Sequence, residues 1–151
     1  MKPRLLIVDD DSTVLRGLSE TLSRWGWEPY PVSSGEEALK TQAAQGFDLV
    51  LLDVKLPDLD GRDVLRQLLE QDSEQLVIMM TAYGDVAVAV ECMKMGAHHY
   101  LQKPFDLEEL RVLLSRSMEL RRMKVELQAL RHRHGSQLQP HQLIGASSAM
   151  A

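Results

Sequence analysis

At 151 residues, the chain is long enough to bury one hydrophobic core and to carry a short appendage. Its formal net charge of −5 argues against nucleic-acid binding through a basic surface, and its single cysteine excludes an intramolecular disulfide framework. The N-terminal apolar run, residues 5–8, is far too short for a signal peptide or a membrane span. We therefore expect a cytoplasmic protein that binds neither membranes nor, directly, nucleic acid.

Five short segments have the character of β-strands. Three of them, 4–8, 48–52 and 76–80, are almost wholly apolar, as strands covered by helices on both faces are. Segment 28–32 contains two prolines, and segment 98–101 is short and half polar. Because proline removes a donor from a β-ladder, we expect the two weaker strands at the edges of the sheet.

Amphipathic helical patterns alternate with these strands and carry capping signals. Ser34 with Glu37 forms a capping box, and three aspartates stand where an N-cap is expected: Asp11, Asp85 and Asp106. Strand–helix alternation with short connections implies parallel strands and right-handed crossovers. We expect a doubly wound α/β domain with a five-stranded parallel sheet of the flavodoxin-like order 2-1-3-4-5.

The last helical pattern is longer than such a domain requires. No proline or glycine occurs from Asp106 to His134, and a helix of that length would measure roughly 40 Å. Apolar residues recur along it with the spacing of a short coiled coil. This apolar seam consists of Leu113, Leu120, Met123, Leu127 and Leu130. Because a monomer would expose the seam, we expect a homodimer formed through the fifth helix and its extension.

These patterns divide the chain into three parts. Residues 1–118 are expected to form the α/β domain, and residues 119–134 a helical coiled-coil linker. Residues 135–151 contain no Asp, Glu, Lys or Arg and are expected to form a flexible tail.

Acidic residues gather where two neighbouring strands of the expected sheet end. Asp9 and Asp10 follow the first strand, and Asp53 follows the third, at the switch point where ligands bind in such sheets. Two carboxylates about 4 Å apart repel by roughly 4 kcal/mol at an effective dielectric constant of about 20, so the cleft calls for a cation. Oxygen ligands favour Mg²⁺, which would also screen a carboxylate from an incoming phosphate.

Two further groups follow the remaining strands on the same side of the sheet. Thr81 offers a hydroxyl and Lys103 an ammonium group to the oxygens of a phosphoryl group. Asp53 is then the candidate nucleophile, because a carboxylate can form an acyl phosphate. An aspartate after a strand is more simply a helix cap, and we assign that role to Asp11 and Asp85.

Four segments, in chain order, resemble the receiver domain of two-component response regulators: LLIVDDD, LLDVKLPDLDG, MMTAYGD and YLQKPF. The resemblance extends from residue 1 to about residue 114. It implies that Asp53 accepts a phosphoryl group from the phosphohistidine of a sensor histidine kinase. It also implies that Asp9 and Asp10 are the acidic pair of a Mg²⁺ site, with Asp10 nearer the metal.

The same resemblance assigns roles to the remaining site residues. The backbone carbonyl of Lys55 is implied as a metal ligand, and Lys103 as the lysine that contacts the phosphate. Thr81 and Tyr100 match a switch pair, although Tyr100 could simply pack on an edge strand. The bond between Lys103 and Pro104 is expected to be cis.

The segments TAYGD and AVAVECMKMGA resemble receivers of sigma-54-dependent activators of the nitrogen-regulation type. The ending HQLIGASSAM resembles the start of the AAA+ ATPase domain of that family. The resemblance implies that residues 135–151 hold the start of a truncated AAA+ domain, with AAA+ and DNA-binding domains in the full-length protein. Phosphorylation would then control dimerisation and a downstream transcription activation domain.

Three functional hypotheses remain open. The first is a phosphorylation-controlled dimerisation switch that catalyses only its own phosphotransfer and dephosphorylation. The second is a pseudo-receiver that binds partners without phosphorylation, against which the complete set of acidic, hydroxyl and lysine groups argues. The third is a metal-dependent phosphatase or phosphotransferase, which would need a general acid, and only Asp9 and Asp10 are candidates.

Overall fold

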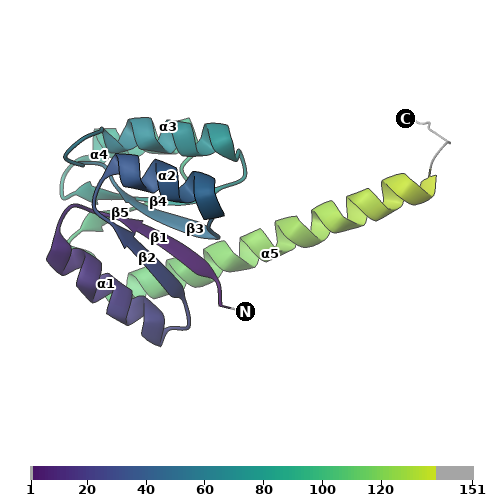
Figure 1. The fold of residues 1–151 in the computed structure, drawn as a ribbon, viewed down its shortest axis with the longest axis horizontal. Helices are drawn as coiled ribbons and strands as arrows, with labels where there is room; N and C mark the ends of the chain where they lie inside the picture. Colours follow the sequence, from purple (N-terminus) through teal and green to yellow (C-terminus); the bar gives the residue numbers. More distant parts are fainter. Residues whose placement is uncertain (1, 139–151) are drawn as a thin grey trace. The chain divides into compact units, whose positions relative to one another are not determined.

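The computed structural model describes the backbone of residues 2–138 and the side chains of residues 2–131. Strands and helices alternate along the chain (Figure 1): β1 (Arg4–Val8), α1 (Ser12–Arg24), β2 (Glu28–Val32), α2 (Gly35–Gln45), β3 (Leu49–Asp53), α3 (Gly61–Gln71), β4 (Leu76–Ala82), α4 (Val86–Met95), β5 (His99–Lys103) and α5 (Leu107–Leu138). Among the described helices, none combines the length and apolar character needed to cross a membrane.

The sheet has the expected order. Its strands run β2-β1-β3-β4-β5, and every neighbouring pair is parallel. The proline-containing strand β2 lies at one edge and the half-polar strand β5 at the other, as predicted. Helices α2, α3 and α4 cover one face of the sheet, and α1 lies on the other (Figure 1). This is the doubly wound α/β fold predicted from the sequence.

The central strands form the core. Every residue of β3 is buried, and Leu5–Val8 of β1 are fully buried. Complete burial of an aliphatic side chain contributes about 1.5–3 kcal/mol, so these strands anchor the domain. They also fix the positions of the side chains at their carboxyl ends, where the candidate site lies.

The strands β3, β4 and β5 extend further toward the site than the apolar runs suggested. Asp53 is the last residue of β3, Thr81 lies inside β4, and Lys103 is the last residue of β5. The prediction that these residues follow their strands was therefore wrong by one or two positions. The reason is that backbone pairing continues past the last apolar side chain, as in the pairs Thr81↔Gln102 and Ala82↔Lys103.

Two of the predicted helix caps form and one does not. The Asp11 carboxylate accepts hydrogen bonds from the amides of Thr13 and Val14, and the Asp106 carboxylate accepts one from Glu108. Asp85 occupies the N-cap position of α4, but its side chain makes no capping hydrogen bond. The capping role assigned to Asp85 was thus wrong, and the first turn of α4 lacks this source of stability.

The capping box of α2 forms with a shift of one residue. The Ser34 hydroxyl accepts a hydrogen bond from the Glu37 amide, as expected. The Glu37 carboxylate, however, accepts from the backbone amide of Ser33 at 3.1 Å. The reciprocal half of the motif therefore reaches one residue further back than the sequence pattern indicates.

The first compact unit of the chain ends at Val112, and the second begins at Leu113, within α5. Helix α5 continues past the predicted end at His134 and reaches Leu138. Along the seam, Leu113 is buried, whereas Met123, Leu127 and Leu130 are 59%, 47% and 47% exposed. Residues 139–151 of the predicted tail lie outside the described residues.

Candidate functional site

Three carboxylates converge at the carboxyl ends of β1 and β3. Asp9 is fully buried, Asp53 is 8% exposed, and Asp10 lies at the surface. One carboxylate oxygen from each residue can be chosen so that all three lie within 4.8 Å of one another. The predicted meeting of acidic side chains from the two strands is therefore present.

Lys103 lies between two of these carboxylates. Its Nζ donates to Asp9 Oδ2 at 2.5 Å and to Asp53 Oδ2 at 2.9 Å. The side chain of Lys103 reaches them from the end of β5, two strands away from β3 in the sheet. The ammonium group thus partly neutralises the buried acids in the structure.

Backbone amides orient the two buried carboxylates in the same way. Asp9 Oδ1 accepts a hydrogen bond from the amide of Asp11, and Asp53 Oδ1 accepts one from the amide of Lys55. In each aspartate, the amide two residues ahead holds one oxygen and leaves Oδ2 for Lys103. This local turn explains why an aspartate at each strand end presents an oxygen to the cleft.

The environment shifts the pKa of both Asp53 and Lys103 upward. Burial raises the pKa of the Asp53 carboxyl, and nearby Asp9 raises it further, whereas the hydrogen bond from Lys103 opposes the rise. For Lys103, burial lowers the pKa, but the hydrogen bonds to Asp9 and Asp53 outweigh it and the pKa is raised. Lys103 therefore stays an ammonium ion at neutral pH.

The acidic cluster suits a small divalent cation. Octahedral Mg²⁺ holds its oxygens at about 2.1 Å, so two ligands on opposite sides of the ion are about 4.2 Å apart. The carboxylate oxygens of the cluster, which lie within 4.8 Å of one another, are close to this spacing. Asp9, Asp10 and Asp53 are the side chains that could hold it, and the Lys55 carbonyl ligand stays a prediction.

Thr81 and Tyr100 flank the acids on β4 and β5. Thr81 is 1% exposed, and its hydroxyl donates to the Leu101 carbonyl at 3.5 Å. Tyr100 is partly buried and packs against the core, with its ring centroid 5.9 Å from that of His99. The packing expected of an edge-strand tyrosine is present, and the role of the two residues as a switch pair stays a prediction. The Lys103–Pro104 peptide bond is cis, as the resemblance implied.

Two aspartates of the β3–α3 loop have roles that the sequence did not reveal. Asp58 accepts hydrogen bonds from the amides of Gly35 and Glu36, both at 2.9 Å, and so caps α2 from a distant loop. Asp60 accepts from the Arg62 amide at 2.9 Å and caps α3. The signal for Asp60 is local and could have been read from the sequence, whereas Asp58 lies more than twenty residues from the helix it caps.

Gly61 allows the start of α3 to approach the end of β3 closely. Its amide donates to the Val54 carbonyl at 2.7 Å. A Cβ at this position would collide with the Asp53 carbonyl oxygen and lie 2.6 Å from Val54 Cα. Since both obstacles are backbone atoms, they cannot rotate away.

Replacing Gly61 by alanine should therefore destabilise the fold by about 1–3 kcal/mol, the usual range for overpacking. Gly17→Ala is the matched control, because a Cβ at Gly17 in α1 meets nothing within 4 Å. There alanine should stabilise the protein by about 0.5–1 kcal/mol through its better helix propensity. Urea unfolding of both variants measures the difference, and equal stabilities would contradict the close approach at Gly61.

Comparison with known proteins identifies a family with the same domain. A family model described as the response regulator receiver domain matches residues 5–115. Sporulation initiation phosphotransferase F of Bacillus subtilis is 34% identical over 121 residues, which are 80% of this chain and 98% of that protein. Regulatory protein AtoC of Escherichia coli is 37% identical over 147 residues, which are 97% of this chain and 32% of that protein. The chain spans about a third of the length of AtoC and of similar longer relatives.

Solved structures agree with this result. The crystal structure of NtrX from Brucella abortus matches with a TM-score of 0.84 and 30% identity, over 99% of this chain and 32% of that chain. A response regulator receiver domain protein from Clostridium thermocellum matches with a TM-score of 0.76 and 31% identity, over 80% of this chain and 98% of that chain. The similarity to this second structure therefore extends over nearly the whole of its chain.

Proposed function

Because the chain belongs to the response regulator receiver domain family, we propose that it accepts a phosphoryl group on Asp53 from a sensor histidine kinase, with Mg²⁺ as cofactor. The observation that carries this proposal is the contact of Lys103 Nζ with the carboxylates of both Asp9 and Asp53, beside Asp10. The carboxylate proposed as the nucleophile, the acids proposed to hold the cation and an ammonium group lie together there. The lone cysteine suits the reducing cytoplasm in which we place this reaction.

In the proposed transfer, an oxygen of the Asp53 carboxylate forms a bond to phosphorus. The bond between phosphorus and the kinase imidazole nitrogen breaks, and its electron pair leaves with the imidazole. Lys103 and the Thr81 hydroxyl would then contact the phosphoryl oxygens. Asp9, Asp10, Asp53 and the Lys55 carbonyl would hold Mg²⁺, which would supply positive charge that offsets the negative charge of the acids and the phosphoryl group.

The phosphoryl group on Asp53 would act as a signal. It adds negative charge and acceptor oxygens beside Thr81, and we propose that Thr81 and Tyr100 respond as the switch pair. The acyl phosphate would form on the protein itself, and the phosphorylated state would last until water hydrolyses the acyl phosphate. In this proposal the chain catalyses its own phosphotransfer and dephosphorylation and is not an enzyme for another substrate.

Incubation with acetyl phosphate and Mg²⁺, followed by intact-mass and peptide mass spectrometry, tests the proposal. We expect one added phosphoryl group on the peptide that contains Asp53, and none when EDTA removes the metal. Complete absence of an adduct at saturating donor would favour the pseudo-receiver, whereas continuous rapid release of inorganic phosphate would favour a phosphatase.

The relatives of greater length suggest what the domain controls. AtoC and DctD are named as regulatory proteins and extend far beyond the matched region. We propose that residues 1–118 form the receiver, 119–134 a coiled-coil linker and 135–151 the start of an AAA+ domain. A sigma-54-dependent activation domain and a DNA-binding domain would then act downstream, and nucleic acid would be bound outside this chain.

Homodimerisation through the seam is the other part of the proposal. Three of its members, Met123, Leu127 and Leu130, each have close to half or more of their surface exposed, and α5 offers them on one helix. Leu113 is already buried in the single chain, so the remaining seam residues would carry the interface.

Replacing both Leu120 and Leu127 by glutamate should convert the proposed dimer into a monomer, because charged side chains at these two seam positions, one heptad apart, cannot be buried in an apolar interface without partners. Val125→Glu is the control, since Val125 is 55% exposed on the same helix but lies off the seam. Sedimentation velocity measures the outcome. A double variant that stays dimeric, or a V125E variant that dissociates equally, would contradict the seam.

A further inference from the structure

Arg62 joins the loop after the phosphoacceptor to a different helix. Its Nε and Nη2 donate to the two oxygens of Asp60 at 3.0 and 2.7 Å, and its Nη1 donates to Glu91 Oε1 at 2.7 Å. Asp60 is the N-cap of α3, whereas Glu91 lies in the middle of α4. One planar guanidinium thus uses three of its donors to hold two elements together.

The Asp60 end of this bridge is rigidly connected to Asp53. Lys55 and Asp60 form an isolated antiparallel bridge, and the Gly61 amide donates to the Val54 carbonyl at 2.7 Å. The loop between them is closed at its base by these contacts. A shift of the backbone at 53–55 must therefore move Asp60 and, with it, Arg62.

The Glu91 end lies on a weakly held helix. The fully buried residues of α4 are small, Ala89 and Cys92, whereas α3 buries Val64, Leu65 and Leu68. Val90 and Met93 on α4 are 45% and 38% exposed. Because α4 buries less apolar surface than α3 and lacks a side-chain cap at Asp85, we expect α4 to be displaced more easily than α3.

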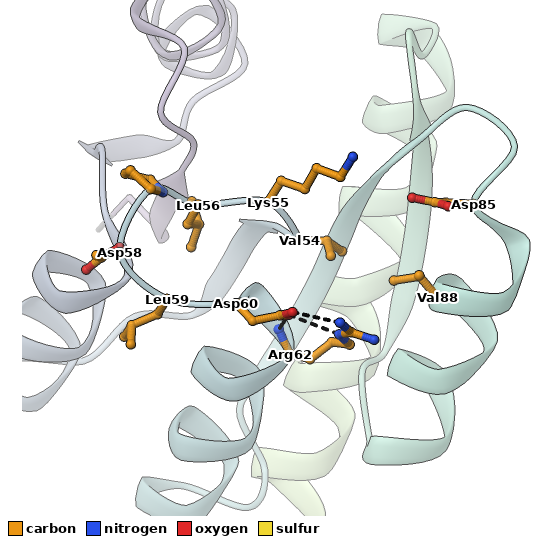
Figure 2. A pocket seen from close by; sticks show the side chains of 10 residues that line it. Val54, Lys55, Leu56, Asp58, Leu59, Asp60, Arg62, Asp85 and Val88 are labelled. Atoms are coloured by element: carbon orange, nitrogen blue, oxygen red, sulfur yellow. Dashed lines mark hydrogen bonds and ion pairs between the residues drawn. The ribbon is translucent and has the colours of Figure 1, made fainter.

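A cavity separates the loop from the start of α4. It has a volume of about 550 Å³ and is lined by Leu56, Asp60 and Arg62 on one side and by Asp85 and Val88 on the other. Figure 2 shows Arg62 paired with Asp60 at this cavity, with Asp85, which precedes α4, and Val88 of α4 across from them. Beside this cavity, the ion pair between Arg62 and Glu91 is a polar connection from α3 to α4.

We infer that Arg62 is a positioning residue that couples the state of Asp53 to the position of α4. By pairing with both Asp60 and Glu91, its guanidinium keeps α4 in the position that it has when Asp53 is unmodified. A change at Asp53 that displaces the following loop weakens the pairing between Arg62 and Glu91. The inference rests on the proposed function, since Asp53 must be the group that changes state. By linkage, weakening the bridge must also change the affinity of Asp53 for a phosphoryl mimic.

Titration with beryllofluoride in the presence of Mg²⁺, followed by NMR, tests the coupling. Arg62→Gln and Glu91→Gln should each raise the apparent affinity for the mimic about two- to five-fold, the range that an exposed ion pair can supply. The double variant should show no further rise, because both substitutions remove the same interaction. A purely electrostatic effect on the anionic mimic would instead give opposite signs for the two single variants.

Arg66→Gln is the matched control. Arg66 lies on the same helix, but its ion pairs with Asp63 and Glu70 stay within α3. Amide hydrogen exchange without any mimic should become faster in α4 for R62Q and E91Q and should be unchanged for R66Q. The coupling is overturned if R62Q behaves like R66Q in both measurements.

The two proposals fail in different ways. A wild-type protein that takes up no beryllofluoride at Asp53 would refute the proposed function and the coupling with it. Uptake by the wild type with identical affinities in all variants would leave the phosphoacceptor role intact and refute the coupling alone.

Discussion

Replacing Asp53 by asparagine should abolish phosphoryl uptake and, at the same time, stabilise the metal-free protein near neutral pH. The amide of asparagine has no anionic oxygen to form an acyl phosphate, so the rate of labelling by acetyl phosphate should fall by ~100-fold or more. Intact-mass spectrometry of the variant beside the wild type measures this loss. Labelling of the variant at the wild-type rate would place the phosphoacceptor elsewhere.

The gain in stability follows from the direction of the Asp53 pKa shift. Burial raises this pKa above its ordinary value of 3.8, so the folded protein disfavours the charged carboxylate. The stability associated with the group is therefore fully present below pH 3.8 and is lost as the pH rises through the raised pKa. Asparagine carries no charge at any of these pH values, so the variant escapes the loss.

Urea unfolding in EDTA at a series of pH values checks this sign. The stability advantage of D53N should be largest near neutral pH and should narrow as the pH falls toward 3.8. Glu20→Gln removes an equal charge from an exposed position of α1 and should change stability little. A D53N variant that is less stable than the wild type at neutral pH would show that the attraction of Lys103 exceeds the cost of burying Asp53.

The sheet could be predicted from the sequence because its signals are local. Apolar runs mark β1, β3 and β4, and the two prolines of β2 assign it to an edge. The ends of the strands were harder to predict. The backbones of three residues pair within the sheet while their polar side chains point to the site: Asp53, Thr81 and Lys103. A run of apolar residues marks the part of a strand whose side chains are buried. The backbone pairing of the strand continues beyond that run.

Parallel topology also accounts for how much of the site was predictable. Once the strand order is known, Asp9, Asp53 and Lys103 must approach one another, because each stands at the carboxyl end of its strand. Which oxygen Lys103 contacts could not be predicted, since it depends on side-chain rotamers and on backbone amides in the following turns. From the sequence, we expected the Lys103 ammonium group to contact a phosphoryl group. In the structure, it contacts the carboxylates of Asp9 and Asp53.

Helix caps and ion pairs between residues far apart in the sequence could not be predicted either, because they depend on the tertiary structure. Asp58 looks like any loop aspartate until the fold brings α2 beside it, and the contact between Arg62 and Glu91 joins residues on different helices. Asp85 shows the converse, because its position before α4 is that of a cap while its side chain makes no capping bond. A local pattern identifies a position, but the tertiary structure decides which partner the side chain finds.

Replacing Lys103 by methionine should change Mg²⁺ binding and phosphoryl uptake in opposite directions. In the wild type, the ammonium group lies 2.5 Å from Asp9 Oδ2 and 2.9 Å from Asp53 Oδ2, so it neutralises the same carboxylates that we propose as metal ligands. Methionine keeps the length of the side chain but leaves the acids without this counter-charge. Mg²⁺ affinity should rise about tenfold, which corresponds to roughly 1.4 kcal/mol of added attraction.

Phosphoryl uptake should fall in the same variant, because the Lys103 ammonium is the group expected to hold the phosphoryl oxygens during transfer. A loss of about 100-fold is typical when one electrostatic contact to a reacting oxygen is removed. The metal-free variant should also be less stable than the wild type by roughly 1–2 kcal/mol. This is below the value for a fully buried pair because the Lys103 side chain is 28% exposed.

Calorimetric titration with Mg²⁺ and acetyl phosphate labelling measure the two effects on one preparation, with Lys40→Met as a control that removes an exposed charge from α2. Added Mg²⁺ should recover the lost stability of K103M, since the ion binds the folded state alone. A general defect in folding would lower both Mg²⁺ affinity and phosphoryl uptake. Only a lysine that competes with the metal and assists the transfer gives a rise in one and a fall in the other, so a K103M variant with weakened Mg²⁺ binding would contradict this account of the site.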